Sequence, residues 1–163
     1  MQTRTRQTVR FSALALGLIL LMAGTGLAQS SNSDMGTWKL NPAKSKYEPG
    51  PLPASDTRVY EVWEKDGVKA TMTVVVDGKS TTRGYASHYD GKQYPYTGNP
   101  EYDTVALKRI DAHTVQGTNS KGGKVVLTTQ TVISADGKTR TQTATGVNLK
   151  GQKVHNVQVY DKQ

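Results

Sequence analysis

The chain has 163 residues and no cysteine, and its 21 Lys and Arg residues outnumber its 13 Asp and Glu residues, for a formal net charge of +8. This length suits one domain with one core, and the lack of cysteine excludes disulfides, thiolate chemistry and a lipid-modified N-terminal cysteine. The basic residues are scattered, with only Lys108 and Arg109 adjacent, whereas nucleic-acid-binding surfaces usually carry a clustered basic stripe. We therefore expect a solvated basic surface and no nucleic-acid partner.

Residues 1–28 have the pattern of a secretory signal peptide. Three arginines stand in the first ten residues, an apolar run extends from Phe11 to Met22, and small residues lead up to Ala28. The run is shorter than the roughly 20 apolar residues of a membrane span, and no later stretch approaches that length. Cleavage after Ala28 removes three of the 21 basic residues and none of the 13 acidic ones, so the net charge falls to +5. A cysteine-free exported chain without a transmembrane segment indicates a bacterial periplasmic or secreted protein.

Two polar segments precede the main β region. Residues 29–34 (QSSNSD) have no apolar period and predict a polar tether, so we expect a single domain over residues 35–163. The segment 41–56 contains four prolines and one glycine and no helical stripe, which predicts an ordered strap or a loop.

The remainder of the chain predicts β-strands throughout. Residues 68–76 alternate apolar and polar side chains, as a strand with one buried face requires. Asp-Gly pairs at 66–67, 77–78, 90–91 and 136–137 predict tight hairpin turns, because a type I′ turn needs positive φ at both central residues. Further strands are predicted at Tyr102–Ile110, Thr114–Thr118, Lys124–Ser134, Thr139–Val147 and Lys153–Tyr160.

These strands, with no convincing helix, predict an all-β fold. Nine or ten strands with short connections favour an antiparallel up-and-down meander closed as a barrel, with a β-sandwich as the alternative. The segment 94–101 (YPYTGNPE) is expected to cross one end of the barrel. The only Phe is Phe11, in the leader, so the barrel core must rely on smaller side chains, which should leave space in the lumen.

Both ends of the β region resemble known barrel families. GTWKL, Gly36 to Leu40, resembles the opening of lipocalins and of fatty-acid-binding proteins, and VQVYDKQ at the C-terminus resembles the closing strand of the latter. The resemblance to this calycin-type group, and to exported bacterial proteins with a lipocalin-like barrel, implies that the first and last strands pair at a seam. It also implies that Trp38 plugs the barrel floor.

The chain departs from the fatty-acid-binding pattern at two places. The family's helical lid corresponds here to the proline-rich segment, and its carboxylate-gripping Arg-x-Tyr corresponds to Gln158 and Tyr160. An amide does not replace a bidentate arginine, although Arg83 or Arg140 could supply the charge from another strand.

Five tyrosines lie within eighteen residues, and four of them are candidate ligand contacts. Such a cluster could stack on a sugar or sterol or seal an amphipathic ligand, or it could pair across strands to replace the missing Phe. With the end motifs, the candidate ligand-binding residues are Trp38, Tyr85, Tyr89, Tyr94, Tyr96, Gln158 and Tyr160.

No pattern in the chain predicts catalysis, a metal site or a cofactor. His88, His113 and His155 are separated and have no metal-ligand spacing, and neither a nucleophile elbow nor a phosphate-binding loop is present. The sequence favours an exported barrel that binds a small apolar or amphipathic ligand, including a lipid, in its lumen. Two alternatives stay open: an envelope accessory protein that acts through its tyrosines or basic surface, and an isomerase- or cyclase-type enzyme with a barrel pocket.

Overall fold

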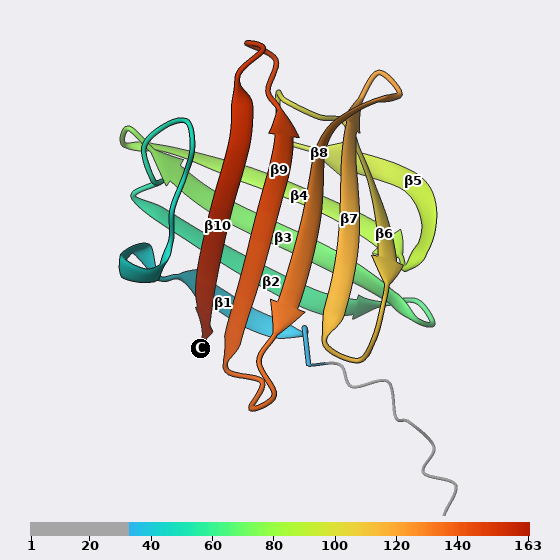
Figure 1. Ribbon diagram of the computed structural model, residues 1–163. Coiled ribbons are helices and arrows are strands. Elements are labelled where there is room, and N and C mark those ends of the chain that lie inside the picture. Colours follow the sequence, from blue (N-terminus) through green and yellow to red (C-terminus); the bar gives the residue numbers. More distant parts are fainter. Residues whose placement is uncertain (1–32) are drawn as a thin grey trace, which may run out of the picture.

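The computed structural model describes residues 33–163, and these form ten antiparallel β-strands (Figure 1). The predicted signal peptide and most of the predicted tether lie outside the described residues. The strands are β1 (Gly36–Leu40), β2 (Ser55–Trp63), β3 (Gly67–Val76), β4 (Lys79–His88), β5 (Asp90–Thr97), β6 (Thr104–Arg109), β7 (Thr114–Lys121), β8 (Lys124–Ile133), β9 (Thr139–Val147) and β10 (Lys153–Lys162).

The strands form a closed up-and-down barrel. Each strand pairs with its neighbours in sequence, and β1 completes the circle by pairing with β10, where Trp38 lies opposite Lys162 and Leu40 opposite Tyr160. The predicted barrel and the predicted seam between the two end motifs are therefore confirmed, and the sandwich alternative is excluded.

Alternate connections of an up-and-down barrel lie at the same end. The strap between β1 and β2 and the β3–β4, β5–β6, β7–β8 and β9–β10 connections share one end, which we call the mouth. The other four turns, Ser33 and the C-terminus lie at the opposite end, the floor, which is at the bottom of Figure 1. The strap contains one 3₁₀ turn, Pro42–Lys44, and no α-helical lid.

Strand β3 follows its predicted alternation. Val68, Ala70, Met72 and Val74 are buried inside the barrel, while Val76, at the mouth, is 37% exposed. The turn that follows it has positive φ at both central residues, 49° at Asp77 and 73° at Gly78, as predicted for type I′.

Two predictions about β5 are wrong. Asp90-Gly91 is not a two-residue hairpin turn but opens β5, where the pairing with β6 is irregular between Asp90 and Gln93. Residues 94–97 do not cross the barrel end but belong to β5, so only residues 98–103 form the mouth loop. Strand β5 pairs with β4 at only two positions, and a strand with so few ladder hydrogen bonds on one side tolerates Pro95, which has no N–H.

Among residues 33–163, no helix is long and apolar enough to cross a membrane.

Candidate ligand-binding site

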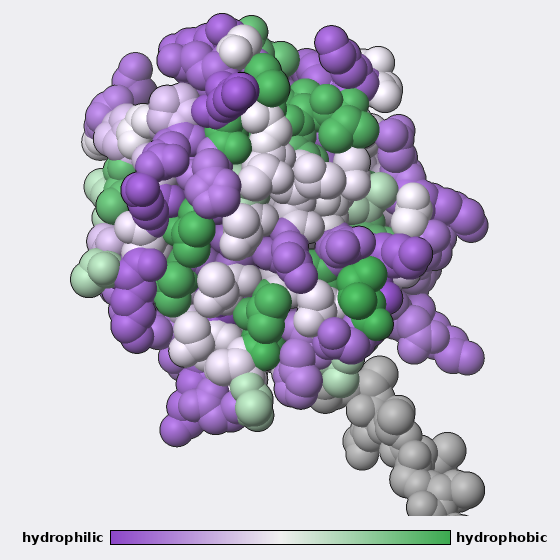
Figure 2. All heavy atoms as spheres, viewed as in Figure 1, coloured by the Kyte–Doolittle hydropathy of each residue, from purple (hydrophilic) through white to green (hydrophobic). Residues whose placement is uncertain are grey.

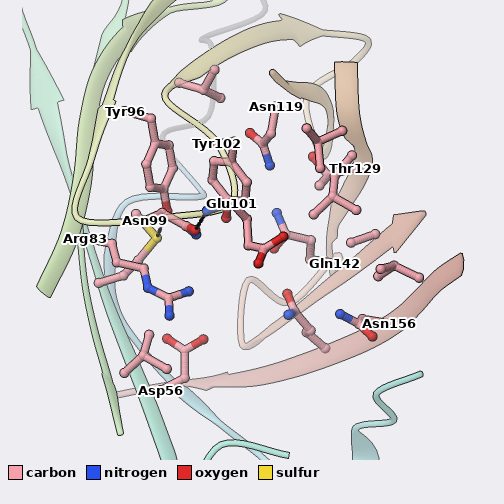
Figure 3. A pocket seen from close by; sticks show the side chains of 18 of the residues that line it. Asp56, Arg83, Tyr96, Asn99, Glu101, Tyr102, Asn119, Thr129, Gln142 and Asn156 are labelled. Carbon is pink, nitrogen blue, oxygen red and sulfur yellow. Dashed lines mark hydrogen bonds between the residues drawn. The ribbon is translucent and has the colours of Figure 1, made fainter. Parts of the chain in front are cut away.

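The barrel encloses a cavity of about 440 Å³ that reaches the mouth (Figure 3). Tyr96 and Tyr102 lie along one wall, and Asn119, Gln142 and Asn156 lie along the opposite wall. Apolar side chains make up much of the remaining lining, among them Met72, Val74, Val105, Leu107 and Val126. Aromatic, amide and aliphatic groups therefore share one lumen.

An ion pair lies in the wall of the cavity. Asp56 and Arg58 both point inward from β2, are 2% and 8% exposed, and are joined by an Nη2–Oδ2 contact of 2.8 Å. Arg58 also donates from Nε to both Asp56 oxygens at 3.2 Å and from Nη1 to Gln142 Oε1 at 2.7 Å. Burial lowers the pKa of Arg58 but the Asp56 carboxylate raises it, and the net shift is well upward. The guanidinium therefore stays charged and is neutralised within the protein.

The closing strand joins this network through Gln158 and Tyr160. The Tyr160 hydroxyl donates to Asp56 Oδ2 at 2.8 Å, and the guanidinium of Arg58 lies 4.4 Å from the centre of the Tyr160 ring. Gln158 accepts from Arg58 Nη2 at 3.3 Å and donates from Nε2 to the Tyr47 hydroxyl of the strap at 2.8 Å. A guanidinium therefore lies beside Tyr160, but it comes from β2 and its charge is neutralised by Asp56.

Arg83 is the cation of the cavity wall that has no anionic partner. It lies across β3 from Arg58, since both pair with Met72, and its guanidinium points into the cavity above Asp56 (Figure 3). The Nε atom is buried and has no hydrogen-bond partner, and no ion pair involves this side chain among residues 33–163. The cavity therefore offers an unused donor with a positive charge.

Three tyrosines pack in a row on the aromatic wall. The ring centres of Tyr85 and Tyr96, which face each other across β4 and β5, are 5.4 Å apart, and those of Tyr96 and Tyr102 are 4.7 Å apart. Tyr85 and Tyr96 therefore pair across neighbouring strands and also line the cavity. Burial raises the pKa of each of these three phenols, so they remain neutral hydrogen-bonding groups at physiological pH.

Two segments partly cover the mouth. The strap places Tyr47 over the cavity and is held by hydrogen bonds from the Glu48 amide to Asn156 Oδ1, 2.9 Å, and from the His155 amide to the Glu48 carbonyl, 2.8 Å. From the opposite side, the β5–β6 loop reaches the β9–β10 hairpin, where Glu101 Oε2 accepts from the Leu149 amide at 3.0 Å. The cavity entrance is therefore framed by hydrogen-bonded segments.

The floor is closed by Trp38 and by Asp34, the residue expected to end the polar tether. Trp38 is fully buried and donates from Nε1 to the Asp34 carbonyl at 3.0 Å. Asp34 is 4% exposed, and its carboxylate accepts from the Tyr89 hydroxyl at 2.5 Å and lies 3.5 Å from Arg109. Asp34 therefore packs as part of the domain.

The structure divides the seven candidate residues into three groups. Tyr85, Tyr96 and Gln158 line the main cavity. Tyr160 is buried in the network around Asp56 and Arg58. The other three lie towards the floor: Trp38 is in the core, the Tyr89 hydroxyl donates to Asp34, and Tyr94 packs against Trp63 and donates from its hydroxyl to Asp90.

Several lumenal residues were not anticipated from the sequence: Tyr47, Asp56, Arg58, Tyr60, Asn119 and Gln142. The sequence did contain a signal for two of them. Asp56 and Arg58 are four and two residues before Tyr60 on one strand, so their side chains lie on the same face as Tyr60, which points inward.

The described residues hold no cluster of three or more His, Asp or Glu side chains that could bind a metal ion. His88 stacks on Trp63 and lies 3.2 Å from Glu64, at the floor end of β4. The arrangement supports non-covalent binding through tyrosine, amide and guanidinium groups.

The chain was also compared with known proteins. No protein-family model matches the sequence, and the search of curated proteins gives no match. The closed ten-stranded antiparallel barrel is compatible with a calycin-like fold.

Proposed function

We propose that this protein is an exported bacterial barrel of the lipocalin or fatty-acid-binding type that holds one small amphipathic ligand in its lumen. The observation that carries the proposal is the cavity of about 440 Å³, which lies within the usual size range of small-molecule sites. The end motifs and the closed barrel support the family assignment. The pattern of residues 1–28 supports export to the periplasm or beyond.

The cavity wall favours an amphipathic ligand over a purely apolar one. An aliphatic chain would leave the Arg83 guanidinium and the Asn119 amide without partners, and unpaired buried polar groups are costly. A ligand with a planar or aliphatic body and an acidic or strongly hydrogen-bond-accepting group would pack on Tyr96 and Tyr102 and place its polar end on Arg83.

A cavity-filling substitution tests the proposal. Ala144 is buried on the inner face of β9, so Ala144→Phe should fill part of the lumen, whereas Thr145→Phe places the same ring on the exposed outer face. We expect calorimetric titration with a panel of amphipathic acids and their neutral amides to detect at least one ligand for the wild type. We expect Thr145→Phe to keep that affinity and Ala144→Phe to lose it.

The same titration tests the role of Arg83. Arg83→Gln should weaken binding of the acid more than binding of its amide, because only the acid uses the guanidinium charge. The proposal fails if Ala144→Phe is folded, by circular dichroism, and binds every ligand as the wild type does. If Arg83→Gln weakens binding of the acid and of the amide equally, the lumenal site remains supported but the proposed contact between Arg83 and the acidic group is wrong.

A further inference from the structure

The mouth carries exposed aliphatic side chains close to the cavity entrance. Leu149 and Val147 of the β9–β10 hairpin are 57% and 49% exposed, and Val125 of the β7–β8 hairpin is 57% exposed. Val76 at the end of β3 and Leu52 of the strap are 37% and 36% exposed. Figure 2 shows apolar surface beside the β9–β10 hairpin and below the β7–β8 hairpin, bordered by hydrophilic side chains. Isolated exposed aliphatics are ordinary, but here they recur on four of the five connections around one opening.

Lysines alternate with these aliphatics. Lys79, Lys124, Lys150 and Lys153 lie on the same turns and hairpins, all four are exposed, and none of them takes part in an ion pair within residues 33–163. We define the mouth rim as these four lysines with Leu52, Val76, Val125, Val147 and Leu149. The rim therefore combines exposed aliphatic side chains with lysines that have no ion-pair partner.

The floor turns are more acidic than the mouth rim, although they also carry Lys65 and Lys138. Their exposed acidic residues are Glu64, Asp66, Asp111 and Asp136.

Of the acids on the mouth connections, Glu48 and Asp103 pair with Lys46 and Lys121, and Glu101 accepts from the Leu149 amide. Asp77 lies in the same turn as Lys79, so the uncompensated charge of the rim comes from Lys124, Lys150 and Lys153. A negatively charged plane would therefore attract the molecule by its mouth and orient it with the floor pointing away.

We propose that the mouth rim docks on an anionic lipid bilayer. Lysines near a bilayer surface are attracted to acidic headgroups, while adjacent Val and Leu side chains can enter the boundary between headgroups and acyl chains. This geometry places the cavity entrance against the lipid surface. The proposal goes beyond ligand binding in the lumen and does not require it, since the rim is complete without a ligand.

Vesicle co-sedimentation of the purified full-domain protein tests the docking surface. We expect binding to vesicles of phosphatidylcholine with phosphatidylglycerol, weak binding to phosphatidylcholine alone, and release by added salt, which screens exposed charges. Lys124→Glu with Lys150→Glu should lower the partition coefficient at least about tenfold, since each lysine near the surface contributes about 1 kcal/mol.

Matched substitutions at the floor serve as controls. Lys65→Glu with Lys138→Glu makes the same change in net charge at the other end, and these exposed lysines lie on floor turns. Ile110→Ser, at a floor residue that is 48% exposed, is the counterpart of Leu149→Ser. We expect both floor variants to bind vesicles almost as the wild type does, and Leu149→Ser to bind several-fold more weakly.

Three results would overturn the proposal. Equal loss of binding in the floor and rim charge variants would mean that net charge alone drives adsorption. Equal binding to neutral and anionic vesicles would remove the role of the lysines. Retention on polyglutamate without any vesicle binding would indicate an acidic macromolecular partner instead of a bilayer.

Discussion

At the residue scale, the dominant feature of the lumen is a buried ion pair whose hydrogen bonds are satisfied inside the protein. The carboxylate of Asp56 accepts hydrogen bonds from Arg58 and from the Tyr160 hydroxyl. The Arg58 guanidinium also donates to the side-chain oxygens of Gln142 and Gln158. Transfer of both charges from water is costly, so the pair contributes less to stability than its short distances suggest. Removal of one partner leaves the other buried and uncompensated.

Asp56→Asn should therefore destabilise the barrel strongly. We expect a loss of about 3–5 kcal/mol in the free energy of unfolding, because Arg58 would remain charged in the lumen without a counter-ion. The double variant Asp56→Asn with Arg58→Met should recover part of that loss. Urea unfolding, followed by circular dichroism, measures both changes.

An exposed ion pair provides the control for this prediction. Lys46 and Glu48 lie 2.6 Å apart but have side chains that are 72% and 50% exposed, so Lys46→Gln should leave the unfolding midpoint almost unchanged. The account of the pair is wrong if Asp56→Asn unfolds at the same urea concentration as Lys46→Gln.

The sequence predicted the candidate site only in part, for a physical reason. The tyrosine cluster placed Tyr85 among the candidates and the resemblance of the closing strand placed Gln158 among them, and both residues line the cavity. Alternation adds only which side chains share a face of a strand. The position of a residue along the barrel axis depends on strand register and tilt, which a single strand does not encode. Tyr89 and Tyr94 therefore lie towards the floor, away from the cavity, although they belong to the same tyrosine cluster.

At the element scale, glycines with positive φ fix the turns, but their surroundings differ. Gly78, with φ of 73°, has open space where a Cβ would be added. Gly98, with φ of 74°, opens the mouth loop, and a Cβ there would overlap the carbonyl oxygen of Thr82 on β4. Gly78 is therefore needed only for its positive φ, whereas Gly98 is needed for its positive φ and for the close approach of β4.

Alanine substitutions should separate these two requirements. Gly78→Ala should cost about 1–2 kcal/mol, the penalty of left-handed backbone for an L-residue. Gly98→Ala should cost about 3 kcal/mol or more, because the backbone of β4 and the loop must also move apart. Thermal unfolding of both variants measures the difference, and equal losses would contradict the close approach at Gly98.

Most strands could be predicted from alternation and turn residues, since both are local properties. The ranges predicted for β8, β9 and β10 agree closely with the structure. The prediction failed at β5, where Asp90-Gly91 and Pro95 have the composition of a turn. There the pairing with β6 overrides local preference, and such tertiary context is not visible in a short stretch of sequence.

At the scale of the whole molecule, the barrel encloses an interior rich in tyrosine. Burial raises the pKa of six phenols: Tyr47, Tyr85, Tyr89, Tyr96, Tyr102 and Tyr160. In the unfolded chain these groups ionise near pH 10, whereas in the folded barrel they stay protonated to higher pH. The unfolded state therefore binds fewer protons than the native state above pH 10, and stability must fall as the pH rises through that range.

The prediction is a barrel that is stable at neutral pH and unfolds cooperatively in alkali. Absorbance of phenolate should show few tyrosines ionising near pH 10 in the native state and most of the eight ionising together with the loss of β-structure at higher pH. If all eight titrate near pH 10 while circular dichroism still reports a folded barrel, the tyrosines are not buried as described.

The central claim is that the lumen holds a small amphipathic molecule, and native mass spectrometry of protein purified from its own cells under gentle conditions tests it most directly. We predict a stoichiometric adduct of one small molecule on the folded protein. That adduct should be recoverable by solvent extraction and absent from Ala144→Phe but present on Thr145→Phe. A single ligand-free mass for the wild type, together with no heat on titration of amphipathic acids or their amides, would contradict the claim.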